Sequence, residues 1–174
     1  MPLPRLGLAE WTVLALTAER PVHGFAIAAL TASDGEIGRV WQIPRPVVYR
    51  AIGRLVEAGL ITAGAVETGG GPPRTLYAAT GQGDELATEW LLTPVAHVRD
   101  LRSEFLLKLA VLHRRGTDPS PLVAGQRAVL EPIVAALRVE QDGADEFDRA
   151  LVAWRRTSAE AALTFLDELA PPSS

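Results

Sequence analysis

The stretch WQIPRPVVYRAIGRLVEAGLI, Trp41–Ile61, decides the fold of this chain. Pro44 and Pro46 stand at the start of a run of helix-forming residues, and Gly59 stands at its end. Proline suits the first turn of a helix, where no backbone N–H donor is needed, and glycine suits the left-handed cap after the last turn. The pattern therefore predicts a helix over Pro46–Ala58.

The predicted helix has one apolar face and one basic face. Its apolar residues recur at helical spacing, and they are Val48, Ile52, Leu55 and Val56. From Arg39 to Arg54 the sequence contains four arginines and no acidic residue, although the whole chain has a net charge of -4. A short helix with a free arginine-bearing face is suited to the major groove of DNA.

The charge of the chain is unevenly divided. Through Thr80 there are seven arginines and six acidic residues, whereas from Gly81 onward there are ten basic and fifteen acidic residues. An acidic segment is repelled by phosphates. We therefore expect DNA contacts within the first 80 residues, with the remainder of the chain used for self-association or sensing.

The elements around the predicted helix define the fold class. Two short strands, Leu60–Val66 and Arg74–Ala79, follow it, and the Gly- and Pro-rich segment Glu67–Pro73 joins them as a loop. Two further helices, Leu8–Ala18 and Gly24–Ala32, precede it. Three helices and a β-hairpin form a winged helix-turn-helix, whose third helix enters the major groove. The sequence predicts a mainly α fold with a small β-hairpin wing and a C-terminal helical region.

Several short motifs resemble one family of regulators. They are Pro21–Phe25 (PVHGF), Val48–Leu55 (VYRAIGRL), Gly59–Ile61, Arg74, Tyr77, Thr80, Gly83, Trp90–Leu91 and Arg99–Leu109 (RDLRSEFLLKL). In their order and spacing these residues are similar to the PadR family of bacterial transcriptional regulators. Family members commonly have a small residue or threonine in place of Pro46 and Val47, and a tyrosine in place of Phe25. The first departure lies where base contacts would be made, so it bears on the operator sequence rather than on the DNA-binding role.

Seven residues are the candidate DNA contacts. We expect Arg45, Val47 and Arg50 to contact base edges or nearby phosphates, and Tyr49 and Arg54 to contact the DNA backbone. Arg74 is expected to contact phosphates beside the wing. Pro46 is expected to contact a thymine methyl group. Two of these assignments have structural alternatives. Tyr49 can instead pack between helices, and Arg54 can instead pair with Glu57.

The second half of the chain is predicted to be helical throughout. The expected helices are Glu85–Leu92, Ala96–Arg115, Pro121–Glu140 and Glu146–Ala170. The last helix carries an apolar stripe, and its candidate dimerisation residues are Phe147, Leu151, Trp154, Phe165 and Leu169. These helices cannot all bury their apolar faces against a small DNA-binding domain, so we predict a homodimer. The expected domains are 1–80 for DNA binding and 81–174 for dimerisation and effector binding.

Enzymatic activity is not indicated by the sequence. The chain has no cysteine, and His23, His97 and His113 lie far apart without carboxylates at metal-ligand spacing. We therefore predict no catalytic residue, no metal site and no cofactor. The N-terminus does not have the pattern of a signal peptide and no apolar run is long enough for a membrane span, so we expect a cytoplasmic protein without a membrane partner.

The function expected from these patterns is that of a homodimeric repressor that binds an inverted repeat through helix 46–58 and wing 67–73. The family resemblance implies a small aromatic or lipophilic effector, and Trp90, His97 and Trp154 are the candidate contacts. The alternative for the tryptophans is that they fill the core. The alternative function is a winged-helix protein-interaction module without sequence-specific DNA binding.

Overall fold

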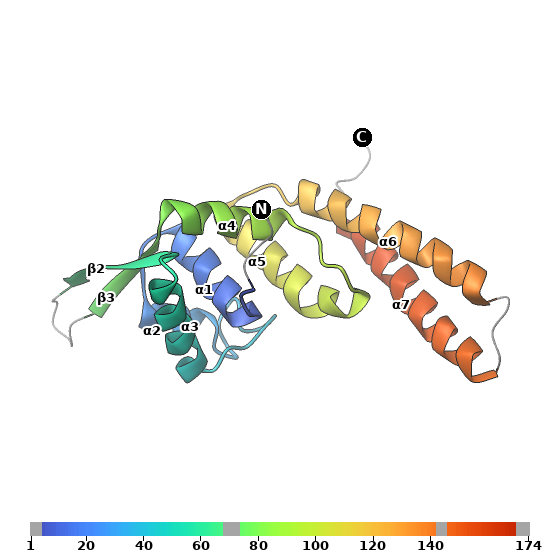
Figure 1. Cartoon of the computed structure of the whole chain (residues 1–174), viewed down its shortest axis with the longest axis horizontal. Coiled ribbons are helices and arrows are strands. Elements are labelled where there is room, and N and C mark those ends of the chain that lie inside the picture. Colours follow the sequence, from blue (N-terminus) through green and yellow to red (C-terminus); the bar gives the residue numbers. More distant parts are fainter. Residues whose placement is uncertain (1–4, 68–73, 142–145, 170–174) are drawn as a thin grey trace. The chain divides into compact units, whose positions relative to one another are not determined.

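The computed structural model describes residues 5–67, 74–141 and 146–169. Its elements in chain order are α1 (Leu8–Glu19), β1 (Val22–His23), α2 (Gly24–Leu30), α3 (Arg45–Glu57), β2 (Ile61–Glu67), β3 (Arg74–Ala79), α4 (Gly81–Leu92), the 3₁₀-helix η1 (Val98–Asp100), the π-helical turn η2 (Leu101–Phe105), α5 (Leu106–Arg115), α6 (Ser120–Gln141) and α7 (Glu146–Leu169) (Figure 1). The predicted fold class is confirmed: the chain is mainly helical and has a small antiparallel sheet.

The helix predicted from Trp41–Ile61 is present as α3 and ends as its sequence indicates. Gly59 has a φ of 70°, and its N–H donates to the carbonyl of Val56 at 3.0 Å. The N–H of Leu60 donates to the carbonyl of Leu55, also at 3.0 Å. These two bonds form a Schellman cap, which satisfies carbonyl groups that the helix leaves free.

The winged helix-turn-helix core is built around α1. Residues 10–17 of this helix are all buried, so the helix has no solvent-facing stripe along most of its length. Helix α3 buries Val48, Ala51, Ile52 and Leu55, whereas Val56, which the sequence pattern assigned to the apolar stripe, is 39% exposed. Ala51 is buried because it lies three residues after Val48 and four before Leu55, on the same face of the helix.

The sheet contains one strand that the sequence did not indicate. Its order is β1-β3-β2, and all neighbouring strands are antiparallel. The two residues of β1 pair with the central strand, Val22 with Tyr77 and His23 with Leu76. Most of the predicted wing loop, residues 68–73, lies outside the described residues.

The chain divides into two compact units at positions that differ from the expected boundary. The first unit comprises Met1–Leu92 and Leu106–Thr117, and the second comprises the remainder. The boundary expected after residue 80 therefore falls within the first unit, because α4 packs on α1. The indole rings of Trp11 and Trp90 are stacked with centroids 5.4 Å apart and an interplanar angle of 1°.

The second unit is organised by the hairpin of α6 and α7, which lie side by side in Figure 1. Its core contains Val134, Leu137, Val152 and Ala159. The single helix predicted over Ala96–Arg115 is instead divided into η1, η2 and α5. Before η1, the buried Gln126 side chain of α6 accepts a hydrogen bond from the Val95 N–H at 2.8 Å and donates one to the Val95 carbonyl at 2.9 Å. These bonds attach the segment that precedes η1 to α6.

Among the described residues, no helix is both long enough and apolar enough to cross a lipid bilayer.

Candidate nucleic-acid interface

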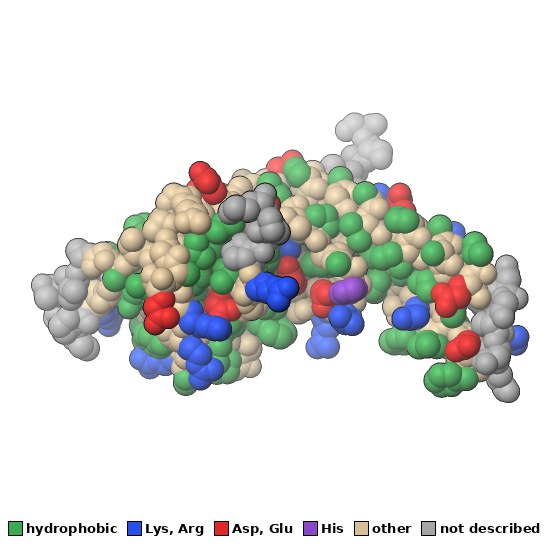
Figure 2. Space-filling model, in the orientation of Figure 1, with side chains coloured by type: hydrophobic (Ala, Val, Ile, Leu, Met, Phe, Trp, Pro, Cys, Tyr) green, Lys and Arg blue, Asp and Glu red, His purple; other side chains and the backbone are tan. Residues whose placement is uncertain are grey.

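Helix α3 presents a continuous exposed face that carries most of the predicted contact residues. Arg45, Pro46, Tyr49 and Arg50 are exposed on its first two turns, and Val47 is half-buried beside them. The first turn contains no acidic residue. Figure 2 shows Lys and Arg side chains gathered over the region of α2 and α3. This face combines positive charge with the free N-terminal end of a helix, which is favourable for phosphate.

An exposed phenylalanine joins α3 to the wing. The Phe25 ring, 54% exposed, lies 5.5 Å from the guanidinium carbon of Arg45 in α3 and 5.8 Å from that of Arg74 in β3. Arg45 also lies 5.7 Å from the ring of Tyr49. Sequence reasoning missed Phe25 as a site residue. The available signal was an aromatic residue directly after His-Gly at the start of a helix.

The beginning of α2 holds this aromatic cluster in place. The Nδ1 atom of His23 lies 3.2 Å from the carbonyl oxygen of Thr75 in β3, which ties the α2 N-terminus to the wing. A Cβ atom at Gly24 would lie 2.9 Å from Cε1 of Tyr49, closer than such contacts normally are. Glycine at this position therefore lets the Tyr49 ring pack against α2, so Tyr49 both packs and remains 41% exposed.

Arg54 has a different partner from the one that the sequence suggested. Its Nη1 atom lies 2.5 Å from Oε1 of Glu10 in α1, a residue 44 positions away. The Arg54 side chain is 67% exposed and the Glu10 side chain is 11% exposed. The pair links α3 to α1 and partly neutralises the charge that Arg54 would bring to DNA.

The three residues predicted to contact an effector have different environments. Trp90 is buried at 2% exposure, between the Trp11 ring and the ammonium group of Lys108, which lies 4.9 Å from its centroid. His97 is exposed before η1, and Trp154 is 72% exposed on α7. Trp90 belongs to the first unit and the other two belong to the second.

The residues predicted for dimerisation form an exposed stripe, with one exception. Phe147, Leu151, Trp154 and Leu169 of α7 are 76%, 42%, 72% and 37% exposed, respectively. Phe165 instead packs edge-to-face on Phe105 within the same unit, with centroids 6.4 Å apart. Figure 2 shows apolar side chains at the surface along this hairpin.

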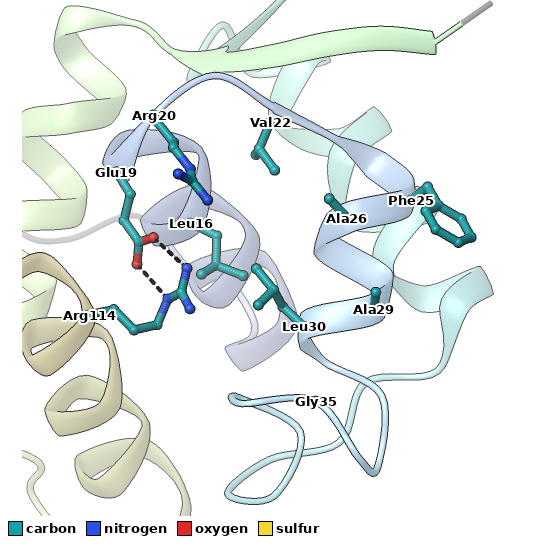
Figure 3. Close-up of a pocket in the computed structure, with 10 residues that line it drawn as sticks. All are labelled: Leu16, Glu19, Arg20, Val22, Phe25, Ala26, Ala29, Leu30, Gly35 and Arg114. Atoms are coloured by element: carbon teal, nitrogen blue, oxygen red, sulfur yellow. Dashed lines mark hydrogen bonds and ion pairs between the residues drawn. The ribbon is translucent and has the colours of Figure 1, made fainter. Parts of the chain in front are cut away.

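A cavity of about 430 Å³ opens between α1, α2 and α5, and it is lined mainly by apolar side chains. Figure 3 shows Leu16 and Leu30 on its wall, beside the ion pair of Glu19 and Arg114, whereas the ring of Phe25 points away from them. Nη2 of Arg114 lies 3.0 Å from Oε2 of Glu19, and Arg114 also pairs with Glu36. The hydrogen bond to Glu19 raises the pKa of Arg114 above its ordinary value. Arg114, at this end of the cavity, is thus paired with both Glu19 and Glu36.

Comparison with known proteins supports the assignment of the first unit. Residues 13–89 match the family model described as the transcriptional regulator PadR-like family. A search of curated proteins found no match.

Three solved structures resemble the chain over nearly its whole length. Bacillus subtilis PadR in complex with operator DNA is 17% identical, with a TM-score of 0.48 over 93% of this chain and 97% of that chain. The protein smu.1604c from Streptococcus mutans UA159 is 15% identical, with a TM-score of 0.45 over 91% and 96% of the two chains. Bacillus subtilis PadR in complex with p-coumaric acid is 15% identical, with a TM-score of 0.46 over 94% and 96%.

The family match covers the region that contains α2, α3 and both wing strands. Members of this family are transcriptional regulators rather than enzymes. Residues 13–89, which contain the winged helix-turn-helix core, therefore match the PadR-like family of transcriptional regulators.

Proposed function

We propose that this regulator is a homodimeric repressor that binds an inverted-repeat operator through α3 and the wing. The observation that carries the proposal is the exposed face of α3 that bears Arg45, Tyr49 and Arg50, because Arg45 on this face shares the Phe25 ring with Arg74 from the wing. Arginine pairs well with guanine and with phosphate through its planar guanidinium group. Two copies of this face, about one helical turn or roughly 34 Å apart, would read the two half-sites.

The test is a salt-titrated binding assay with the duplex upstream of the chain's own gene and an unrelated duplex of equal length. We expect tight and selective binding that weakens steeply as salt rises, because phosphate contacts release counterions. Arg50→Ala is expected to weaken binding and to lower the salt slope by about one if Arg50 contacts a phosphate. Arg99→Ala is the matched control, since Arg99 is 79% exposed but lies in the second unit.

Equal and weak binding to both duplexes, unchanged in Arg50→Ala, would contradict the proposal. The alternative function, a winged-helix protein-interaction module, would then be favoured. Its partner binding would not depend on the arginines of α3.

The homodimer part of the proposal is supported by the exposed stripe on α7. Phe147, Leu151 and Trp154 follow one another at helical spacing, and such large apolar side chains favour burial against a partner.

Trp154→Glu is expected to shift the protein from dimer to monomer in sedimentation equilibrium. Thr164→Glu adds the same charge at an exposed position of α7 outside this stripe and is expected to leave the dimer intact. A dimer that persists in Trp154→Glu would contradict the proposal.

The effector part of the proposal is release of the repressor by a small aromatic or lipophilic compound. Trp154 is 72% exposed and therefore accessible to such a compound, and the apolar cavity beside Leu16 offers a second place for it. A panel of small aromatic compounds should be titrated against the complex with DNA. Loss of DNA binding at a saturating concentration would support the proposal, provided that Trp154→Ala or Leu16→Phe changes the concentration needed. Binding to DNA that no compound alters would contradict it.

A further inference from the structure

Phe25 combines high exposure with two close cationic neighbours. A single exposed apolar residue is ordinary on a protein surface. This ring, however, lies within 6 Å of guanidinium groups from two separate elements, at 5.5 Å for Arg45 and 5.8 Å for Arg74. Cation–π attraction is effective at such distances and arginine stacks well on aromatic faces. Phe25 therefore brings together the start of the recognition helix and the start of the second wing strand.

The start of α2, which carries Phe25, is held by contacts on two sides. His23, two residues earlier, pairs with Leu76 of β3, and its ring nitrogen lies against the Thr75 carbonyl. Gly24 lets the Tyr49 ring approach α2 closely. The start of α2 is thus attached to the wing through β1 and to α3 through Tyr49, which keeps the backbone of Phe25 near both arginines.

The two arginines remain available to an anion. Within the part of the chain that the structure describes, neither Arg45 nor Arg74 forms an ion pair, and both side chains are exposed. Stacking on an aromatic face restrains a guanidinium group and leaves its N–H groups free to donate in the plane of the group. An arginine that is already ordered loses less side-chain entropy on binding.

We propose that Phe25 is a positioning residue that holds Arg45 and Arg74 as one composite site for DNA backbone phosphate, shared between the recognition helix and the wing. This inference rests on the DNA-binding function proposed above and deepens it. The site takes phosphate rather than a base, so its contribution is independent of sequence and sensitive to salt. Phe25 also lines one side of the cavity of Figure 3, whereas Arg45 and Arg74 are not among the lining residues.

The test compares Phe25→Leu with Phe25→Tyr on a mixed-sequence duplex at low salt. Leucine keeps the apolar bulk but has no aromatic face, whereas tyrosine keeps the face. We expect Phe25→Leu to weaken binding about three- to tenfold, because one or two arginine side chains would then lose conformational entropy when they become ordered on DNA. Phe25→Tyr is expected to bind like the unmodified protein. Because the ring is 54% exposed, neither variant should unfold at a lower temperature, and a thermal melt checks this.

A double-mutant cycle distinguishes positioning from a general structural role. In the Arg45→Ala/Arg74→Ala background, Phe25→Leu should have no further effect on affinity, since there is no guanidinium group left to hold. An equal loss in both backgrounds would overturn the proposal, as would a Phe25→Leu protein that binds like the unmodified one.

A measurement on the free protein distinguishes failure of this inference from failure of the proposed function. In NMR spectra, stacking should shift the Arg45 and Arg74 side-chain protons upfield, and Phe25→Leu should remove the shift for Arg74. Absence of these shifts in a protein that binds DNA overturns the inference alone. Their presence in a protein that binds no duplex overturns the proposed function, and the phosphate site with it.

Discussion

At the scale of single residues, the charge available to DNA is set by which arginines already have partners. Arg45 and Arg74 contact aromatic faces, which leaves their charge unneutralised. Arg54 instead pairs with Glu10 of α1. Three arginines that look alike in the sequence therefore have two different electrostatic environments, and we expect them to contribute differently to binding.

The Glu10–Arg54 pair leads to a prediction on affinity. Glu10→Gln removes the partner charge, so we expect binding to a mixed-sequence duplex to become tighter and the salt slope to rise by up to about one. The free energy of unfolding should fall by less than about 1 kcal/mol, because the Arg54 side chain is mostly exposed and its pairing is screened by solvent. Fluorescence anisotropy and urea unfolding check the two effects. A gain in affinity that persists in the Arg54→Ala background would contradict this explanation.

Two glycines of the α3 region lead to opposite predictions on stability. Gly59 has a φ of 70°, a conformation that a residue with a side chain adopts at a cost, so Gly59→Ala should lower the free energy of unfolding by about 1 kcal/mol. Gly53 lies inside α3, and a Cβ there meets nothing within 4 Å. Gly53→Ala should therefore raise the free energy of unfolding by roughly 0.5–1 kcal/mol. Chemical denaturation of both variants checks the pair, and the same sign of change in both would refute the argument.

At the scale of elements, the α6–α7 hairpin combines an apolar core with ion pairs along its exposed side. Glu160 of α7 accepts a hydrogen bond from Nη2 of Arg138 in α6 at 2.9 Å and one from Nη1 of Arg156 at 2.7 Å. The hydrogen bond from Arg138 is the main cause that lowers the pKa of Glu160 below its ordinary value, and Arg156 contributes further. We therefore expect the stability of the hairpin to depend on pH in the acid range.

The sign of this pH dependence follows from the lowered pKa. A carboxyl group whose pKa is lower in the folded state stabilises the fold above its unfolded pKa, and the effect is lost as the pH falls through the folded value. Glu160→Gln should therefore destabilise the hairpin at pH 7, and its difference from the unmodified protein should vanish in acid, below the lowered pKa. Thermal melts followed by circular dichroism at both pH values check this. A difference of the same size in acid would show that the carboxylate charge is not responsible.

At the scale of the whole molecule, the first unit is discontinuous in sequence. It takes α4 and α5 from beyond the wing, and buried side chains of these helices complete its core. Trp90 and Lys108 are 2% and 1% exposed. The first unit therefore requires both of its segments, which residues 93–105 of the second unit separate in the sequence.

Truncation tests this organisation. A fragment that ends at residue 80 loses the Trp11–Trp90 stack and should unfold or aggregate, because the Trp11 surface is left uncovered. A fragment of residues 1–117 keeps every element of the first unit and should fold as a monomer with weak DNA binding, since α6 and α7 are absent. Circular dichroism and sedimentation velocity check both fragments. A well-folded 1–80 fragment would contradict the role given to α4.

What the sequence by itself determined here are properties that depend on neighbouring residues. Pro46 and Gly59 give the two ends of α3 to within a residue or so, because proline and glycine act on the local backbone dihedral angles. The alternation of turn residues and β-formers likewise predicts the wing strands, and the family motifs around His23 and Arg50 indicate a PadR-like regulator. The exposure of Arg50 follows from the helical period.

Only the tertiary structure decided which distant residues meet. Glu10 rather than Glu57 pairs with Arg54, Phe25 lies against both Arg45 and Arg74, and Trp90 is a core residue of the first unit. The two-residue strand β1 exists only because β3 is beside it, and two residues are too few to show a period. These features depend on the packing of elements far apart in the chain, and local backbone preferences carry no information about that packing.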